Sequence, residues 1–194
     1  MQAKEALGIY EQLDDVSGQA RSLCQLAYLL HADRQLDAAE EAALQVISRF
    51  SSKGEQFRVC ECHRVLGHIC RSKGETEEAI DHFKTALEIA SSFNWHDPLF
   101  WTHKSLAEAF IYKGRFDDAR SHIEHAKFHA INDAYRLGHV VEQQARFWYM
   151  QQEFEEARSA ASHAADVYER FEATKDLERC RALLQSLKKA EMQT

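Results

Sequence analysis

Small residues recur along the chain at a spacing of about forty positions, and they do so in two series that keep a constant offset. The first series consists of Ala27, Gly67, Ala107 and Ala145. The second series follows twelve positions later in each case and consists of Ala39, Ala79, Ala119 and Ala157. Self-similarity at a period of 20 to 50 residues is typical of stacked repeat proteins. The pattern therefore predicts one array of similar units.

Apolar positions within each unit follow a helical period and form two stripes separated by a break. In the second unit the first stripe runs from Cys60 to Cys70, and Gly74 then marks a C-terminal stop. The return stripe runs from Ala79 to Ile89. Each unit is therefore predicted to be two amphipathic helices joined by a short turn, which makes the chain all-α.

The two series of small residues have a packing explanation. Antiparallel helices joined by a tight turn pack at axial distances of roughly 8–10 Å. Only glycine, alanine or serine fits where the two backbones come closest. A large side chain at Ala79 or Ala119 is expected to overpack the pair at a cost of roughly 1–3 kcal/mol or more.

The repeat predicts a single domain over residues 1–194, with one unpaired helix at each end. The predicted boundaries are 1–14 for the second helix of a truncated repeat, 17–52, 55–93, 96–131 and 134–171 for four helix pairs, and 174–191 for a C-terminal capping helix. Ala6-Leu7-x-Ile9 matches Ala86-Leu87-x-Ile89. The chain is therefore expected to begin inside a second helix, as a piece of a longer array or with another domain or partner covering that end.

Composition and charge narrow the function classes. A net charge of −7 argues against a general nucleic-acid binder, because no excess of lysine and arginine neutralises phosphates. No signal-peptide core or run of membrane-spanning length is present. Five cysteines without a framework spacing are typical of free thiols in a reducing compartment, so a cytoplasmic or nuclear protein is expected. No phosphate-binding glycine loop, nucleophile elbow or paired zinc motif occurs, so neither an enzyme nor a cofactor is predicted.

Two local clusters have a chemical and a structural interpretation. His122, His125 and His129 lie near one face of one helix, with Asp118 four residues before the first of them. This set suits zinc or nickel, but ligands on a single helix rarely close a tetrahedral site, so a solvated polar face is favoured over a metal site.

The second cluster is Cys60-x-Cys62-His63, which reads as a thiol site or as core packing. Packing is favoured, because Cys60 and His63 fall on the apolar stripe, where cysteine behaves as a small hydrophobe.

The order of residues in the units resembles the tetratricopeptide repeat. The second unit shows it in Leu66-Gly67, Cys70, Gly74, Ala79, Phe83 and Ala86, and the third in Leu106-Ala107, Phe110, Gly114, Ala119, Ile123 and Ala126. The unit length is similar to the long form found in kinesin light chains, Pins-type adaptors and the repeat arms of STAND-type NTPases. The departures are Gln144 in the Leu-Ala pair of the fourth unit and Arg34 and Gln152 at turn glycines. The resemblance implies an α-solenoid, a right-handed superhelix of about four helix pairs plus one flanking helix at each end.

The resemblance also implies that the first helix of each unit lines a concave groove. The peptide-binding residues carried over on this basis are Arg21, Tyr28, Arg64, His68, Arg71, Trp101, Lys104, Glu108, Tyr112, Arg146 and Tyr149. Cations beside aromatic rings suit a peptide with an acidic residue and an apolar anchor. The alternative is that these long side chains only solvate an exposed face, helped by Glu61 and Glu108. The carboxylate clamp of chaperone-binding relatives uses asparagines that are missing at these positions.

These observations favour a protein-interaction module that binds a peptide or partner segment, with acidic groups suited to its groove, and no nucleic acid or membrane. Two alternatives stay open. One is a structural or sensor arm of a larger protein, for example of the STAND NTPase type, with other domains of a longer chain as its partners. The other is a regulator that responds to a small peptide.

Overall fold

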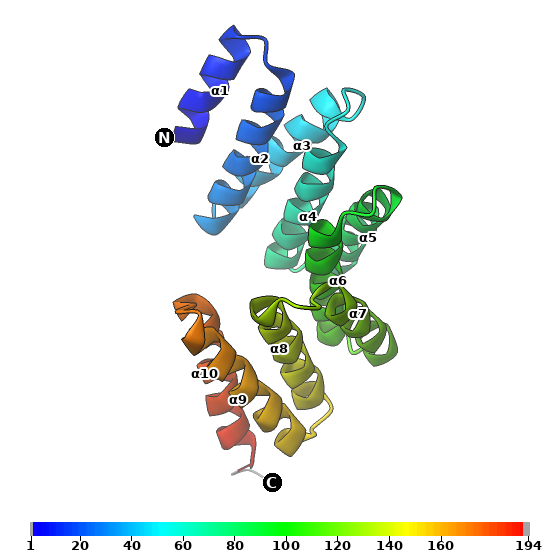
Figure 1. Ribbon diagram of the computed structural model, residues 1–194, viewed down its shortest axis with the longest axis vertical. Coiled ribbons are helices and arrows are strands. Elements are labelled where there is room, and N and C mark those ends of the chain that lie inside the picture. The colour runs from blue at the N-terminus through cyan, green and yellow to red at the C-terminus, as the bar shows by residue number, and fades with distance from the viewer. Residues whose placement is uncertain (1, 192–194) are drawn as a thin grey trace. The chain divides into compact units, whose positions relative to one another are not determined.

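The computed structural model describes the backbone of residues 2–191 and the side chains of residues 5–190. This span forms ten α-helices joined by short turns and contains no strand (Figure 1). The helices are α1 (Gln2–Gln12), α2 (Val16–Ala32), α3 (Leu36–Phe50), α4 (Gln56–Lys73), α5 (Thr76–Ser92), α6 (His96–Tyr112), α7 (Phe116–His129), α8 (Ala134–Met150), α9 (Phe154–Arg170) and α10 (Thr174–Glu191). The all-α prediction is confirmed.

The turns between paired helices use one residue in the left-handed conformation. Gly74 and Gly114 have φ of 87° and 70°. Arg34 and Gln152, which stand at the equivalent turns, have φ of 62° and 65° and so adopt the same conformation with a side chain present. A left-handed residue after the last helical turn lets the chain reverse while its amide caps the helix. The two departures from the glycine pattern therefore do not change the turn.

Two helices begin at aspartates that cap them. The Asp15 side chain accepts a hydrogen bond from the amide of Gly18 at 2.9 Å, and the Asp133 side chain accepts one from the amide of Arg136 at 2.9 Å. These contacts satisfy amides that have no partner inside the first turn. Both capped helices, α2 and α8, are the first helices of their pairs.

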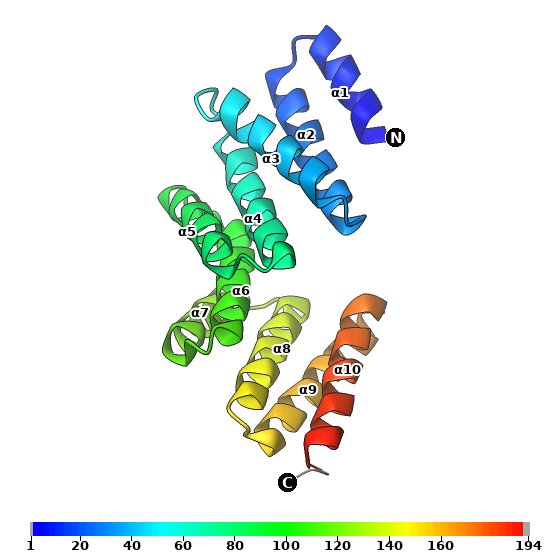
Figure 2. The same ribbon diagram turned by 180° about the vertical axis from the view of Figure 1, so that it is seen from behind.

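The chain divides into two compact units, one ending at Thr102 and the other starting at His103, so that α6 contributes to both. In the first unit α2, α3 and α4 lie side by side (Figures 1 and 2). Ala27, Ala39 and Ala79 of the two small-residue series are fully buried there. A Cβ built on Gly67 would lie 2.4 Å from Cε1 of Phe83, so the absent side chain of α4 is what admits the phenyl ring of α5.

The second unit repeats this packing in α8, α9 and α10. Ala145 and Ala157 are fully buried between α8 and α9. Tyr168 of α9 and Cys180 and Leu187 of α10 are also fully buried, so α10 closes the apolar face of the preceding pair. Terminal helices of repeat arrays need this division between an inner apolar and an outer polar face.

The five cysteines are free thiols and all are buried. The Cys60 thiol donates to the carbonyl oxygen of Ala86 at 3.3 Å, which joins α4 to α5. Burial raises the pKa of Cys60 to about 11 and that of Cys180 to about 12. Thiols held in this way are packing groups and weak nucleophiles.

No helix within residues 2–191 has the length and apolar character that crossing a membrane requires.

Candidate functional site

A pocket of the first unit lies between α2 and α4 and has a volume of about 240 Å³. Its lining consists of Arg21, Cys24, Gln25, Tyr28, Arg58 and Glu61. The first four belong to α2 and the last two to α4, and on each helix they recur one turn apart. The helical period of the two neighbouring helices is therefore what brings these side chains around one opening.

Two arginines of this pocket are held by neighbouring groups. Arg21 donates from Nη2 to the Tyr10 hydroxyl at 2.8 Å, and its guanidinium carbon lies 5.6 Å from the centre of the Tyr10 ring. Arg58 donates from Nη1 to Oε2 of Glu61 at 2.7 Å along α4. The pairing with an aromatic ring and with a carboxylate orients both guanidinium groups while leaving them charged.

A third arginine is fixed against the aromatic side chain of the pocket. Arg64 donates to the Tyr28 hydroxyl, and its guanidinium carbon lies 5.7 Å from the centre of the Tyr28 ring. Burial raises the pKa of Tyr28 above its ordinary value, so this hydroxyl stays protonated. Cys24 donates from Sγ to Oε2 of Glu61 at 3.7 Å. Glu61 is the one carboxylate of the lining. The lining thus combines two cations, Arg21 and Arg58, with one anion, and Arg64 adds a third cation beside it.

Some of the predicted groove residues lie in the first compact unit, which ends at Thr102. Of these, the structure brings Arg21, Tyr28 and Arg64 to this pocket or its edge. His68 lies further along α4, with its ring 5.1 Å from that of Phe83. Arg71 is on the last turn of α4, and Trp101 of α6 packs edge-on against Phe100 at 4.8 Å. These last three residues therefore lie outside the pocket lining.

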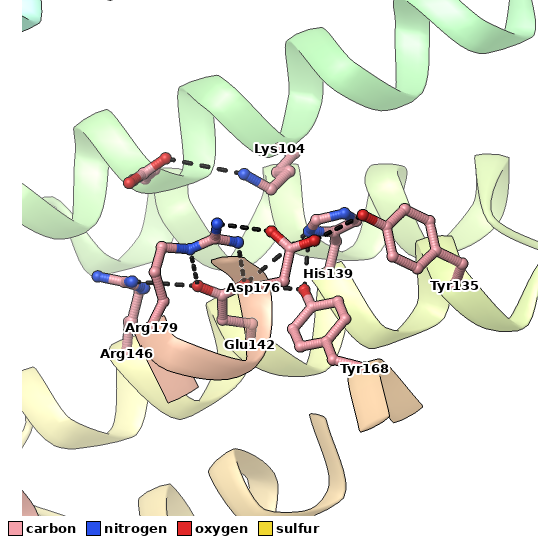
Figure 3. A network of polar contacts seen from close by, with 9 residues as sticks. Lys104, Tyr135, His139, Glu142, Arg146, Tyr168, Asp176 and Arg179 are labelled. Atoms are coloured by element: carbon pink, nitrogen blue, oxygen red, sulfur yellow. Dashed lines mark hydrogen bonds and ion pairs between the residues drawn. The ribbon is translucent and has the colours of Figure 1, made fainter. Parts of the chain in front are cut away.

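The predicted groove residues of the second unit make contacts with other polar and aromatic side chains. Lys104 Nζ lies 3.9 Å from Oε2 of Glu108 on the same helix, and Tyr112 is 72% exposed. The Tyr149 ring lies 6.2 Å from that of Phe154. Arg146 belongs to a network around Glu142, and Lys104 lies near the same network (Figure 3).

That network surrounds Glu142, which is 1% exposed (Figure 3). Arg179 of α10 donates to both carboxylate oxygens, from Nε at 3.0 Å and from Nη2 at 2.9 Å. Arg146 donates at 3.1 Å and the Tyr168 hydroxyl at 2.8 Å. Burial alone would raise the pKa of Glu142, but its contacts with His139 and Arg179 hold it well below the usual range. The carboxylate is therefore ionised and fully engaged.

A second layer continues the network from Arg179. Its Nη1 lies 2.6 Å from Oδ1 of Asp176, and the Tyr135 hydroxyl donates to Oδ2 of the same carboxylate at 2.6 Å. Burial, and then this hydrogen bond, raise the pKa of Tyr135 to about 12. The two carboxylates tie α10 to α8, which makes the network a structural link of the second unit.

The histidines of α7 surround a buried histidine of α6 that the sequence interpretation missed. His103 is 6% exposed, and its Nδ1 lies 2.8 Å from Nδ1 of His122. The ring of His125 stacks on it at 4.8 Å and that of His129 at 5.9 Å. Among the described residues no three His, Cys, Asp or Glu side chains are arranged to hold a metal ion. The sequence feature that could have identified His103 is its position one repeat length, forty residues, after His63.

Paired antiparallel helices with small residues at their closest approach define a helical-repeat protein of the α-solenoid class. Residues 58–127 match the family model of the tetratricopeptide repeat, so this part of the chain carries tetratricopeptide repeats, as the resemblance predicts. No curated protein sequence matches the chain.

Two solved structures show the same fold. BtubC (BKLC) from P. vanneervenii is 16% identical, with a TM-score of 0.73 over 99% of this chain and 90% of that one. A Rap protein complexed with competence and sporulation factor is 17% identical, with a TM-score of 0.68 over 97% of this chain. The chain spans 57% of the length of that Rap protein.

Proposed function

We propose that this chain is a protein-interaction module that binds an acidic segment of a partner in the pocket between α2 and α4. The observation that carries the proposal is a set of three oriented arginines at an opening of about 240 Å³: Arg21 and Arg58 line it, and Arg64 is held beside it by Tyr28. Guanidinium groups match carboxylates in shape and charge and can bind both carboxylate oxygens. An aspartate or glutamate of the partner is the group that fits this lining.

The distribution of charge along the helices supports an acidic partner. The cations of α4 are Arg58, Arg64, Arg71 and Lys73, against the single carboxylate Glu61. The neighbouring α5 has the opposite balance, with Glu77, Glu78, Asp81 and Glu88 against Lys84. Lys73 is bound by Asp37 and Glu40 at 3.2 and 2.6 Å, and Arg58 is bound by Glu61 at 2.7 Å. The cations of α4 still outnumber its carboxylate by four to one.

Aromatic groups give the site its apolar part. Tyr10 and Tyr28 present their rings to Arg21 and Arg64. A partner side chain entering the pocket would contact the Tyr28 ring, which lines it, beside its acidic group. His68, Arg71 and Trp101 extend the proposed surface along the first unit. The Rap protein crystallised with competence and sporulation factor supports a bound partner on this fold.

A selection from a displayed library of random twelve-residue peptides tests the proposal. The wild-type chain is expected to enrich peptides with aspartate or glutamate next to an aromatic or leucine residue. The double variant Arg21→Ala, Arg64→Ala is expected to lose this enrichment, because it removes two of the three guanidinium groups. Lys84→Ala, an exposed cation of α5, is the matched control and should select the same peptides as the wild type. Selection of the same peptides by the double variant, or of peptides without acidic residues by the wild type, would contradict the proposal.

A further inference from the structure

The two central helix pairs each contain a histidine–histidine contact at the same place in the repeat. His63 and His103 are forty residues apart, and so are their partners His82 and His122. One contact joins α4 to α5 in the first unit, and the other joins α6 to α7 in the second. Because the two contacts are one repeat length apart, the same packing of paired helices places both of them.

The geometry of the two contacts is nearly the same. Nδ1 of His63 lies 3.2 Å from Nδ1 of His82, with ring centres 5.5 Å apart and planes at 40°. Nδ1 of His103 lies 2.8 Å from Nδ1 of His122, with ring centres 5.1 Å apart and planes at 39°. Two nitrogens at these distances form a hydrogen bond only when one carries a proton and the other offers its lone pair. Protonation of both would place two N–H donors and two positive charges against each other.

The charged surroundings differ between the pairs. Burial lowers the pKa of His82, while Asp81 beside it on α5 and Glu40 near it on α3 act in the opposite direction. The charged group acting on His63 is His82 itself. In the first pair burial therefore opposes a charge on either ring, and a charge on His82 would further oppose one on His63.

In the second pair, the charged groups that act on His103 belong to α7. His122, His125 and His129 act on His103, and each one opposes a charge there. Asp118, one turn before His122, is paired with Arg115 at 2.8 Å. Protonation of His103 together with these histidines would place like charges on α6 and α7, and the two helices would repel each other.

We propose that the two histidine pairs make the α4–α5 and α6–α7 helix pairs open on acidification, with protons as the ligand. A closed pair keeps one lone pair facing one N–H, whereas an opened pair exposes both rings to water and lets both accept protons. Acid therefore favours separation of the two helices. This device does not depend on the peptide site.

The sign follows from the pKa values in the two states. Burial, and then His82, lower the pKa of His63 to about 4, and burial together with the three α7 histidines lowers that of His103 to about 3. Both groups return to an ordinary pKa of about 6.5 once exposed. The contribution to stability is complete above pH 6.5 and is lost as the pH falls toward the lowered values. In that window the opening constant rises by up to about tenfold per pH unit for each pair.

The test compares the urea unfolding equilibrium of the full chain with that of a variant at pH 7.5 and at pH 5.5. The variant replaces both histidine pairs with the residues at the equivalent positions of the first and fourth repeats. These residues are Leu23 and Ala42 in the first repeat and Val141 and Ala160 in the fourth. Its substitutions are His63→Leu, His82→Ala, His103→Val and His122→Ala. Between the two pH values the unfolding constant of the wild type is expected to rise by up to about tenfold more for each pair than that of the variant. The same pH dependence in both proteins would overturn the proposal.

A second measurement needs no variant. The ring signals of the eleven histidines are followed by NMR as the wild-type chain is titrated from pH 7.5 to pH 5. At least two rings are expected to remain at their neutral positions at pH 5 while the chain is still folded. Protonation of all eleven rings above pH 5.5 in the folded chain would overturn the proposal even if the variant failed to fold.

Discussion

Glu142→Ala is expected to lower the free energy of unfolding of the second unit by about 3–5 kcal/mol. Glu142 is 1% exposed and accepts hydrogen bonds from Arg179, Arg146 and Tyr168. Its removal leaves two guanidinium groups without their shared carboxylate and breaks the Arg179–Glu142 link between α10 and α8. Urea unfolding followed by circular dichroism measures the change.

Glu169→Ala is the matched control, since it removes the same kind of side chain from α9 in the same unit. The Glu169 side chain is 70% exposed and lies 3.8 Å from Arg181. An exposed pair of this kind contributes less than about 1 kcal/mol. Equal effects of the two substitutions would show that the Glu142 network does not stabilise the unit.

Gly67→Ala is expected to lower the free energy of unfolding by about 1–3 kcal/mol through overpacking. The new Cβ would lie 2.4 Å from Cε1 of Phe83, and the Phe83 ring is fully buried, so one helix has to shift. Gly8→Ala is the control, because a Cβ there meets nothing within 4 Å. Alanine in place of glycine in an open helical position raises stability by about 0.5–1 kcal/mol. The two substitutions should therefore have opposite signs in urea unfolding, and a stabilising Gly67→Ala would contradict the packing argument.

The parts of the fold that follow from short-range rules could be predicted from the sequence. Small residues such as Gly67 and Ala79 mark where two backbones approach, and this requirement is visible in residue size alone. The turns at Arg34 and Gln152 show its limit, because the left-handed conformation there is imposed by the packed helices rather than by a glycine. The packing of the paired helices therefore outweighs the preference of a non-glycine residue for negative φ.

The site was only partly predictable, because its contacts join residues that have no periodic relation. Arg21 and Arg64 follow from the groove positions of the repeat. Tyr10, which orients Arg21, lies on the unpaired helix α1, where the repeat gives no rule for its direction. Arg179 meets Glu142 across 37 positions of sequence, and no pattern of apolar residues specifies which charged side chains will pair.

The most direct test of the account is an isothermal titration of the wild-type chain with a selected acidic peptide. We expect a binding constant that weakens when salt is raised, because the attraction between guanidinium and carboxylate groups is screened. Arg21→Ala, Arg64→Ala is expected to weaken binding by about tenfold or more, since each charged hydrogen bond contributes roughly 1.5–3 kcal/mol. Lys84→Ala should leave the constant unchanged. A binding constant that is the same for the wild type and the double variant would contradict the assignment of the α2–α4 pocket as the binding site.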